Sequence, residues 1–92
     1  MGLIRLHITV KGTVQGVGFR YYAQMKAVQH KITGWVKNTD EGTVEMVAVG
    51  EKEDMELFLE DLRRGNPFSK VTELITKELE ETEPYQSFII KY

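Results

Sequence analysis

The sequence contains 92 residues, 41% of them hydrophobic, and its formal net charge is −2 at pH 7. Domains usually contain about 50 to 250 residues, so we expect residues 1–92 to form one domain. The chain has no cysteine, which excludes disulfides, thiolate metal sites and a cysteine nucleophile. Nucleic-acid modules more often carry a clustered basic excess. The balance of 12 basic against 14 acidic residues therefore gives no reason to expect a nucleic-acid partner.

The first residues carry Arg5 and a potentially charged His7. Charges at these positions interrupt the apolar run that a signal peptide or a membrane span requires. We therefore expect no membrane partner and a cytoplasmic location.

The first predicted element is a half-buried strand over residues 4–11. Apolar and polar side chains alternate along this segment, so each kind occupies one face. Residues 12–18 then contain three glycines, which favours an irregular loop. A helix of about three turns follows, because apolar residues recur at helical spacing from Phe19 and no Gly or Pro interrupts residues 19–32.

The rest of the chain predicts a hairpin, a second helix and two strands. Residues 33–38 and 43–49 flank the turn-forming segment 39–42. Residues 55–62 carry apolar side chains at i, i+3, i+4 and i+7, and Gly65-Asn66-Pro67 ends this helix. Residues 71–79 are rich in β-forming types, and residues 87–92 follow an acidic turn at 80–84 as a last short strand.

The resulting order of elements is β, α, β, β, α, β, β. It predicts an α+β fold, the ferredoxin-like βαββαβ sandwich, in which two helices cover one face of an antiparallel sheet, with a short extra C-terminal strand. The first two strands run parallel through a right-handed crossover, so their carboxyl ends lie at the same edge of the sheet. We expect the loop 12–18 and Asn38 to share that edge.

The loop 12–18 ends where a helix begins, and the first amides of a helix lack intrahelical partners. No Ser, Thr, Asp or Asn lies in the four residues before Phe19, so no ordinary N-cap is available. Gly16 and Gly18 allow a ligand to approach the backbone closely, and a helix N-terminus favours an anion. Arg20 adds a planar guanidinium that can donate two hydrogen bonds to a phosphate. The segment therefore predicts an oxyanion-binding site.

Two other phosphate motifs are excluded by inspection. Gly16-Val17-Gly18 has no third glycine at position 21, and no Gly-Lys-Ser/Thr follows the loop. Taken without Arg20, a Gly-rich turn is more often purely structural, and Asn38 alone is more often a turn residue at a strand end. The wider pattern has to decide between these interpretations.

That wider pattern consists of three segments: Val-Lys-Gly-Thr-Val-Gln-Gly-Val-Gly-Phe-Arg at 10–20, Gly-Trp-Val-Lys-Asn at 34–38 and Asp-Glu-Gly-Thr-Val-Glu at 40–45. Together they closely resemble the acylphosphatase family, and the likeness extends over nearly the whole chain. The resemblance implies an enzyme that hydrolyses acyl phosphates to a carboxylate and inorganic phosphate. A free-standing monomer is expected.

The resemblance also implies the roles of individual residues. Arg20 matches the phosphate-binding arginine, and Asn38 matches the residue that positions the attacking water. Backbone amides complete the phosphate cradle, and they belong to Gln15, Gly16, Val17, Gly18, Phe19 and Arg20. The substrate phosphate is expected to accept the proton of the water, so that no metal or cofactor is required. The chain departs from the family pattern at Gly65-Asn66-Pro67, where a Gly-Pro-Pro-like turn is expected.

Two alternatives stay open at this point. The same pattern occurs as an amino-terminal domain of much larger carbamoyl-transferring maturation proteins, but these need additional domains, so a free-standing enzyme is favoured. A ferredoxin-like module could instead bind RNA or a small regulatory ligand without catalysis. RNA recognition predicts aromatic side chains on the sheet within a basic surround, and the polar face of the first strand has no aromatic residue.

His7 and His30 lack partners at metal-ligand spacing, and both are predicted to be solvated.

Overall fold

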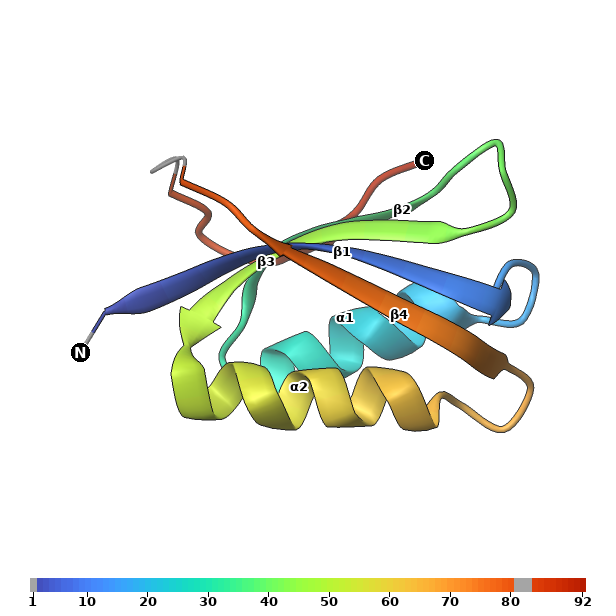
Figure 1. Cartoon of the computed structure of the whole chain (residues 1–92), viewed down its shortest axis with the longest axis horizontal. Coiled ribbons are helices and arrows are strands. Elements are labelled where there is room, and N and C mark those ends of the chain that lie inside the picture. Colours follow the sequence, from blue (N-terminus) through green and yellow to red (C-terminus); the bar gives the residue numbers. More distant parts are fainter. Residues whose placement is uncertain (1, 81–83) are drawn as a thin grey trace.

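The elements of the structure follow the predicted order (Figure 1). The structure is a computed structural model that describes residues 2–80 and 84–92. The elements are β1 Leu3–Thr13, α1 Phe19–Gln29, β2 Thr33–Asn38, β3 Val44–Glu51, α2 Lys52–Arg64, β4 Lys70–Glu78 and β5 Phe88–Ile90. Residues 81–83 of the predicted acidic turn lie outside the described residues.

The strands form one five-stranded sheet in the order β4-β1-β3-β2-β5. β1 pairs antiparallel with β3 and β4, and β2 pairs antiparallel with β3. Both helices cover the same face of this sheet (Figure 1), which confirms the ferredoxin-like sandwich. The C-terminal strand differs from the antiparallel pattern, because β5 pairs with β2 in parallel. The sheet is therefore mixed, since β5 reverses direction relative to β4 and so runs the same way as β2.

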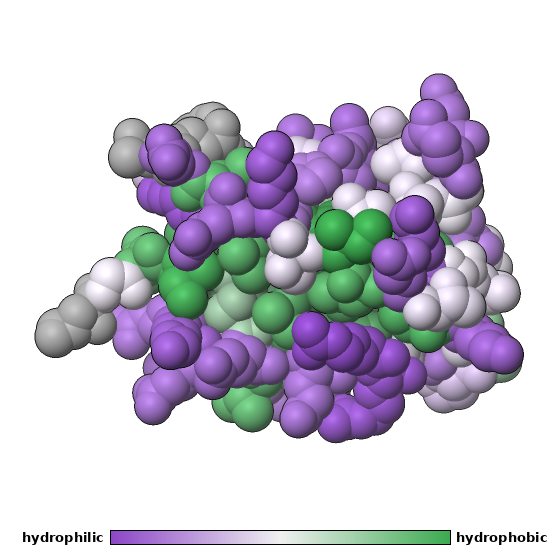
Figure 2. Space-filling model, viewed as in Figure 1, coloured by the Kyte–Doolittle hydropathy of each residue, from purple (hydrophilic) through white to green (hydrophobic). Residues whose placement is uncertain are grey.

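The core lies between the sheet and the two helices. The alternation predicted for the first strand points Ile8 and Val10 into this layer, where both are fully buried. Met55, Phe58 and Leu62 supply the buried side of α2. Apolar surface shows along the seam between the sheet and α2, while the outer face of α2 is mostly hydrophilic (Figure 2). Side chains of one sheet face and two helix faces thus make a single core cluster.

The glycine-rich loop is shorter than predicted. Gly12 and Thr13 belong to β1, where they pair with Val71 and Lys70 of β4 after a register shift at Lys11/Gly12. Gly12 has φ 127°, and a Cβ there would lie 2.0 Å from the backbone oxygen of Lys70. Only glycine fits this bulge. The loop proper therefore covers residues 14–18.

Both helices end where the backbone leaves the right-handed region. α1 stops at Gln29, and the following Lys31 has φ 60°. α2 stops at Arg64, and Gly65 has φ 73° and donates its N–H to the backbone oxygen of Asp61 at 3.0 Å. In residues 2–80 and 84–92, no helix is long and apolar enough to cross a membrane.

Candidate active site

A pocket of about 150 Å³ lies at the carboxyl ends of β1 and β2. It brings together the loop after β1, the start of α1, the end of β2 and the last residues of the chain. Its lining consists of Val14, Gly16, Gly18, Phe19, Arg20, Tyr21, Asn38, Ile90 and Tyr92. The predicted meeting of the loop with Asn38 at one edge of the sheet is therefore confirmed.

The start of α1 presents backbone amides at this pocket. Gly18 is the N-cap with φ 76°, and within the described chain no side chain caps the helix. Tyr22 makes the first backward bond of the helix, from its N–H to the oxygen of Gly18 at 3.0 Å. The amides before Tyr22 therefore have no intrahelical acceptor, and the dipole of the helix adds partial positive charge there. Gly16 has φ 75°, which keeps the loop in a conformation that L side chains avoid.

Arg20 is held against the last two residues of the chain. Its Nη1 donates to the backbone oxygen of Lys91 at 3.4 Å, and its guanidinium carbon lies 4.7 Å from the centre of the Tyr92 ring. The side chain is partly exposed and lines the pocket. Both contacts orient the guanidinium at the rim of the same space that the loop amides enclose. The sequence pattern did not indicate Tyr92 as part of the site, because its distance along the chain from Arg20 hides the contact.

Asn38 is the last residue of β2, two positions after the fully buried Val36. The alternation of the strand places Asn38 on the helix-covered face, close to the start of α1. Its Oδ1 atom is buried and has no hydrogen-bond partner among the described residues. A buried amide oxygen that accepts no hydrogen bond is unfavourable, so this atom is available to a donor from a water or ligand in the pocket.

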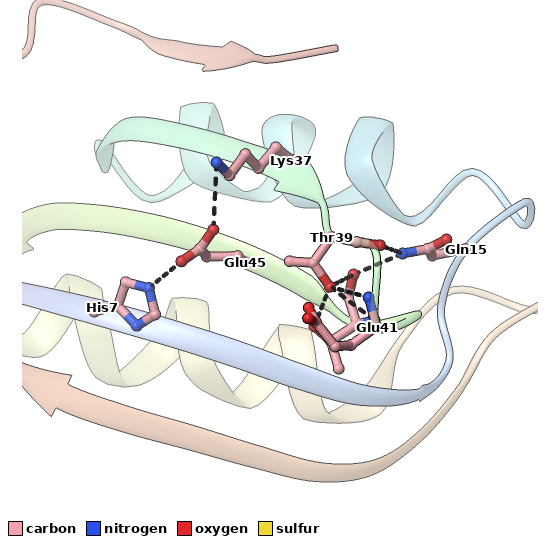
Figure 3. A network of polar contacts seen from close by, with 7 residues as sticks. His7, Gln15, Lys37, Thr39, Glu41 and Glu45 are labelled. Atoms are coloured by element: carbon pink, nitrogen blue, oxygen red, sulfur yellow. Dashed lines mark hydrogen bonds and ion pairs between the residues drawn. The ribbon is translucent and has the colours of Figure 1, made fainter.

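Gln15 connects the loop to the β2–β3 turn. Its Nε2 donates to the backbone oxygens of Thr39 and Thr43, each at 2.8 Å. The hydroxyls of Thr39 and Thr43 lie 2.7 Å apart and close the turn. Figure 3 shows the Gln15 side chain reaching into this network from the neighbouring loop. The sequence predicted a role for the Gln15 backbone amide, and the structure adds a contact of its side chain that the local pattern did not indicate.

Comparisons with known proteins agree with this geometry. Residues 6–90 match the family model described as Acylphosphatase. The chain is 49% identical over 90 residues to an acylphosphatase of Bacillus licheniformis, covering 98% of this chain and 100% of the relative. The chain belongs to the acylphosphatase family. The predicted family and the predicted enzyme class, acyl phosphate hydrolase, are thereby confirmed.

Solved structures of acylphosphatase relatives also match. The crystal structure of the acylphosphatase from Bacillus subtilis superposes with a TM-score of 0.93 at 45% identity, covering 97% of this chain and 99% of that one. The crystal structure of HypF from T. kodakarensis matches with a TM-score of 0.85 at 36% identity, but the match covers only 12% of that chain. The likeness to the shorter acylphosphatases therefore extends over their full length, whereas the likeness to HypF is confined to a small part of it.

Both histidines are paired, which the sequence did not indicate. The His7 side chain is 32% exposed and that of His30 is 13% exposed, so the prediction that both are solvated holds only in part for His7 and is wrong for His30. His7 Nε2 lies 2.6 Å from Glu45 Oε2, and His30 Nε2 lies 2.7 Å from Asp61 Oδ2. The hydrogen bond from His7 lowers the pKa of Glu45, against a smaller opposing effect of burial, and the charges of His7 and Lys37 lower it further. Neither histidine lines the pocket.

Asp61 joins the two helices. Burial by itself would raise the pKa of this carboxyl, but the hydrogen bonds from His30 and Arg64 and the charges of Lys26 and His30 outweigh burial and lower the pKa. His30 and Lys26 come from or adjoin α1, while Asp61 and Arg64 lie on α2. The His30–Asp61 pair is part of the packing between the two helices, and neither residue lines the pocket. Across the described parts of the chain, no group of three or more His, Cys, Asp or Glu residues is arranged to hold a metal ion.

Proposed function

We propose that Arg20, Asn38 and the backbone amides of residues 15–20 carry out acyl phosphate hydrolysis in this enzyme. The phosphoryl group would occupy the pocket at the start of α1. The observation that carries the proposal is the meeting of three features at one place. These are helix amides without intrahelical acceptors, the Arg20 guanidinium, and the unpartnered Oδ1 atom of Asn38.

The loop and the helix start supply the phosphate cradle. The amides of Gln15, Gly16, Val17, Gly18, Phe19 and Arg20 offer preorganised donors for the equatorial oxygens of the phosphoryl group. Arg20 contributes the full positive charge and can bind two of these oxygens at once. Phosphoryl transfer needs little covalent chemistry from a protein, so positioning and charge stabilisation supply most of the rate enhancement.

Asn38 holds the attacking water. Its Oδ1 accepts a hydrogen bond from the water, which directs an oxygen lone pair toward phosphorus. The amide is too weakly basic to remove a proton, and the pocket lining of the described chain contains no Asp, Glu or His side chain. The proton of the water therefore passes to a non-bridging oxygen of the substrate phosphate. The bond from water to phosphorus forms while the bond from phosphorus to the acyl oxygen breaks.

The leaving group explains why so small a site is sufficient. An acyl phosphate is a mixed anhydride, and the group that leaves is a carboxylate. A carboxylate departs without protonation at neutral pH, because its pKa lies near 4. The site therefore needs no general acid. The products are a carboxylate and inorganic phosphate, and no metal or cofactor takes part in this scheme.

The test is hydrolysis of benzoyl phosphate by the purified protein with excess chelator. We expect chelator-resistant turnover in the parent, and a loss of about 10² to 10³ in kcat for Arg20→Ala and for Asn38→Ala, the scale for one preorganised donor. Arg20→Lys should recover only part of the activity, since it keeps the charge but not the planar fork. Arg63→Ala is the matched control, because Arg63 is an exposed cation on α2. Folded Arg20→Ala or Asn38→Ala protein with parental turnover would refute the residue roles.

The same proposal treats residues 1–92 as one domain, because a single core cluster joins both helices to the sheet. A monomeric state is part of the proposal. Light scattering coupled to gel filtration checks it, and a dimer mass at assay concentration would contradict it. The cytoplasmic location stays a prediction.

A further inference from the structure

Asn66 contacts the phosphate-binding loop from outside the pocket. Its Nδ2 donates to the backbone oxygen of Val17 at 2.8 Å, although the two residues are 49 positions apart in the chain. A Cβ atom on Gly18 would lie 3.8 Å from the same Nδ2. The side-chain amide of Asn66 therefore packs against the peptide group that links Val17 to Gly18.

The orientation of the Asn66 amide is determined by its partner. A carbonyl oxygen only accepts hydrogen bonds, so the amino end of the side chain must face Val17. The Oδ1 atom at the other end is buried and has no partner among the described residues. Asn66 thus keeps its bond to the loop while its Oδ1 atom has no partner among the described residues, which is an uncommon arrangement for a buried amide.

The turn that carries Asn66 is itself firmly held. The N–H of Asn66 donates to Ser69 Oγ at 3.0 Å, and the N–H and hydroxyl of Ser69 both donate to the backbone oxygen of Asn66 at 3.1 Å. Gly65, immediately before it, is bonded to Asp61 at the end of α2. The bond from Asn66 to Val17 therefore ties the loop to the turn that follows α2.

The effect on the site follows from peptide geometry. In a trans peptide the C=O and the following N–H lie in one plane and point in opposite directions, and the described chain has no cis peptide bond. Holding the Val17 oxygen toward Asn66 therefore directs the Gly18 N–H away from Asn66. Gly18 lines the pocket, and it has φ 76°, where glycine rotates with little steric resistance.

We propose that Asn66 is a positioning residue for phosphate binding, which fixes the Val17–Gly18 peptide so that the Gly18 N–H points into the cradle. This inference rests on the proposed function, since it assigns a support to one of the amide donors. The residue lies in the turn that follows α2, so this turn supports the loop that borders the pocket.

The experiment compares Asn66→Ala and Asn66→Asp with the parent protein. Inorganic phosphate is the ligand, and its affinity is measured by competitive inhibition of benzoyl phosphate hydrolysis. Loss of one hydrogen bond corresponds to a few-fold change, so Asn66→Ala should weaken phosphate binding by about 3- to 10-fold and raise KM more than it lowers kcat. Asn66→Asp should weaken it further, because a carboxylate oxygen would face the Val17 oxygen and add negative charge near phosphate.

The matched control is Gln24→Ala. Gln24 Nε2 donates to the backbone oxygen of Phe88 at 3.0 Å, so this variant removes the same kind of bond at a place outside the pocket lining. It should leave phosphate affinity unchanged even where its stability falls as much as that of Asn66→Ala. An affinity change of equal size in both variants would mean that general loosening of the fold is responsible, and would overturn the proposal.

A second readout does not depend on the folding of either alanine variant. In the parent, titration with phosphate should shift the amide resonance of Gly18 strongly, and Asn66→Asp should reduce that shift. An unshifted Gly18 amide in a parent that binds phosphate and hydrolyses benzoyl phosphate would overturn this inference alone. A parent that neither binds phosphate nor hydrolyses the substrate would overturn both this inference and the proposed function.

Discussion

The side-chain nitrogen of Gln15 lies 2.8 Å from the backbone oxygen of Thr39, the residue that follows Asn38. This bond joins the loop that presents the amides to the turn that ends the strand carrying Asn38. A second bond, to the oxygen of Thr43, is equally short. The relative position of the loop amides and the Asn38 side chain is therefore set by one side chain as well as by the sheet.

Removing the Gln15 side chain should uncouple these two parts of the site. We predict that Gln15→Ala lowers kcat by about 10-fold and the free energy of unfolding by about 1 to 3 kcal/mol, because two part-buried carbonyl oxygens lose their donor. Gln15→Glu should be worse, since an ionised carboxylate has no N–H to donate. Benzoyl phosphate kinetics and urea denaturation measure the two effects.

Gln29→Ala serves as the control for Gln15. Gln29 is an exposed residue at the end of α1, and its side-chain oxygen accepts a 3.4 Å hydrogen bond from Lys26. We expect parental kcat and a change in unfolding free energy within about 0.5 kcal/mol. If Gln15→Ala kept parental kcat while losing stability, the bond would be structural only.

The ring of Tyr92 should tune the position of Arg20. A cation over an exposed aromatic ring contributes about 0.5 to 1 kcal/mol, which corresponds to a few-fold effect. We predict that Tyr92→Leu raises KM for benzoyl phosphate about 2- to 5-fold, and that Tyr92→Phe stays near the parent because it keeps the ring face. Equal behaviour of the Leu and Phe variants would show that the ring does not act on Arg20.

The sequence predicted most of the fold because the relevant patterns are local. Alternation along residues 4–11 and the helical spacing of Met55, Phe58 and Leu62 depend only on neighbours in the chain, and the structure places these residues as expected. The meeting of the loop with Asn38 followed from the handedness of a single crossover. The bulge at Gly12 was not predicted, because its cause is the close approach of β4, which is distant in sequence.

Side-chain partners between distant elements could not be predicted in the same way. The pairs His30–Asp61, Gln15–Thr39 and Asn66–Val17 join residues 31, 24 and 49 positions apart. No periodicity marks such pairs, since each depends on how whole elements pack. Anion binding by Arg20 was predicted from the residues of its own segment, whereas the water-positioning role of Asn38 came from a family resemblance. The structure adds the geometry within which both roles can be tested.

The free energy of unfolding should depend on pH through the carboxyl group of Asp61. Its carboxyl is bonded to His30 and Arg64 and faces Lys26, and its pKa is lowered in the folded state. A lowered folded pKa stabilises the protein above the unfolded value, and this stabilisation is lost as pH falls through the folded value. We predict that Asp61→Asn costs about 2 kcal/mol of unfolding free energy at pH 5 and less at pH 3.

Denaturant unfolding of parent and Asp61→Asn at the two pH values measures this difference. Asp40→Asn is the control, because Asp40 is exposed in the β2–β3 turn and should show the same small effect at both values. A difference between parent and Asp61→Asn that stays constant from pH 5 to pH 3 would show that the carboxylate charge is not what stabilises the helix pair.

The packing of α2 against the sheet should depend strongly on Phe58. This side chain is fully buried, and its ring lies edge-to-face with that of Phe88 at a centroid distance of 6.0 Å and an angle of 71°. Truncating a buried Phe costs about 3 to 5 kcal/mol, a large share of the roughly 5 to 14 kcal/mol expected for a chain of this length. We predict that Phe58→Ala lowers Tm by more than about 10 °C, whereas Leu57→Ala, at a position 50% exposed, lowers it only slightly.

Thermal unfolding followed by circular dichroism distinguishes the two, and similar Tm values for both variants would mean that α2 is not anchored through Phe58. Because Phe58 does not line the pocket, the folded fraction of Phe58→Ala should keep parental KM at low temperature, so that its loss of activity on warming follows its loss of fold.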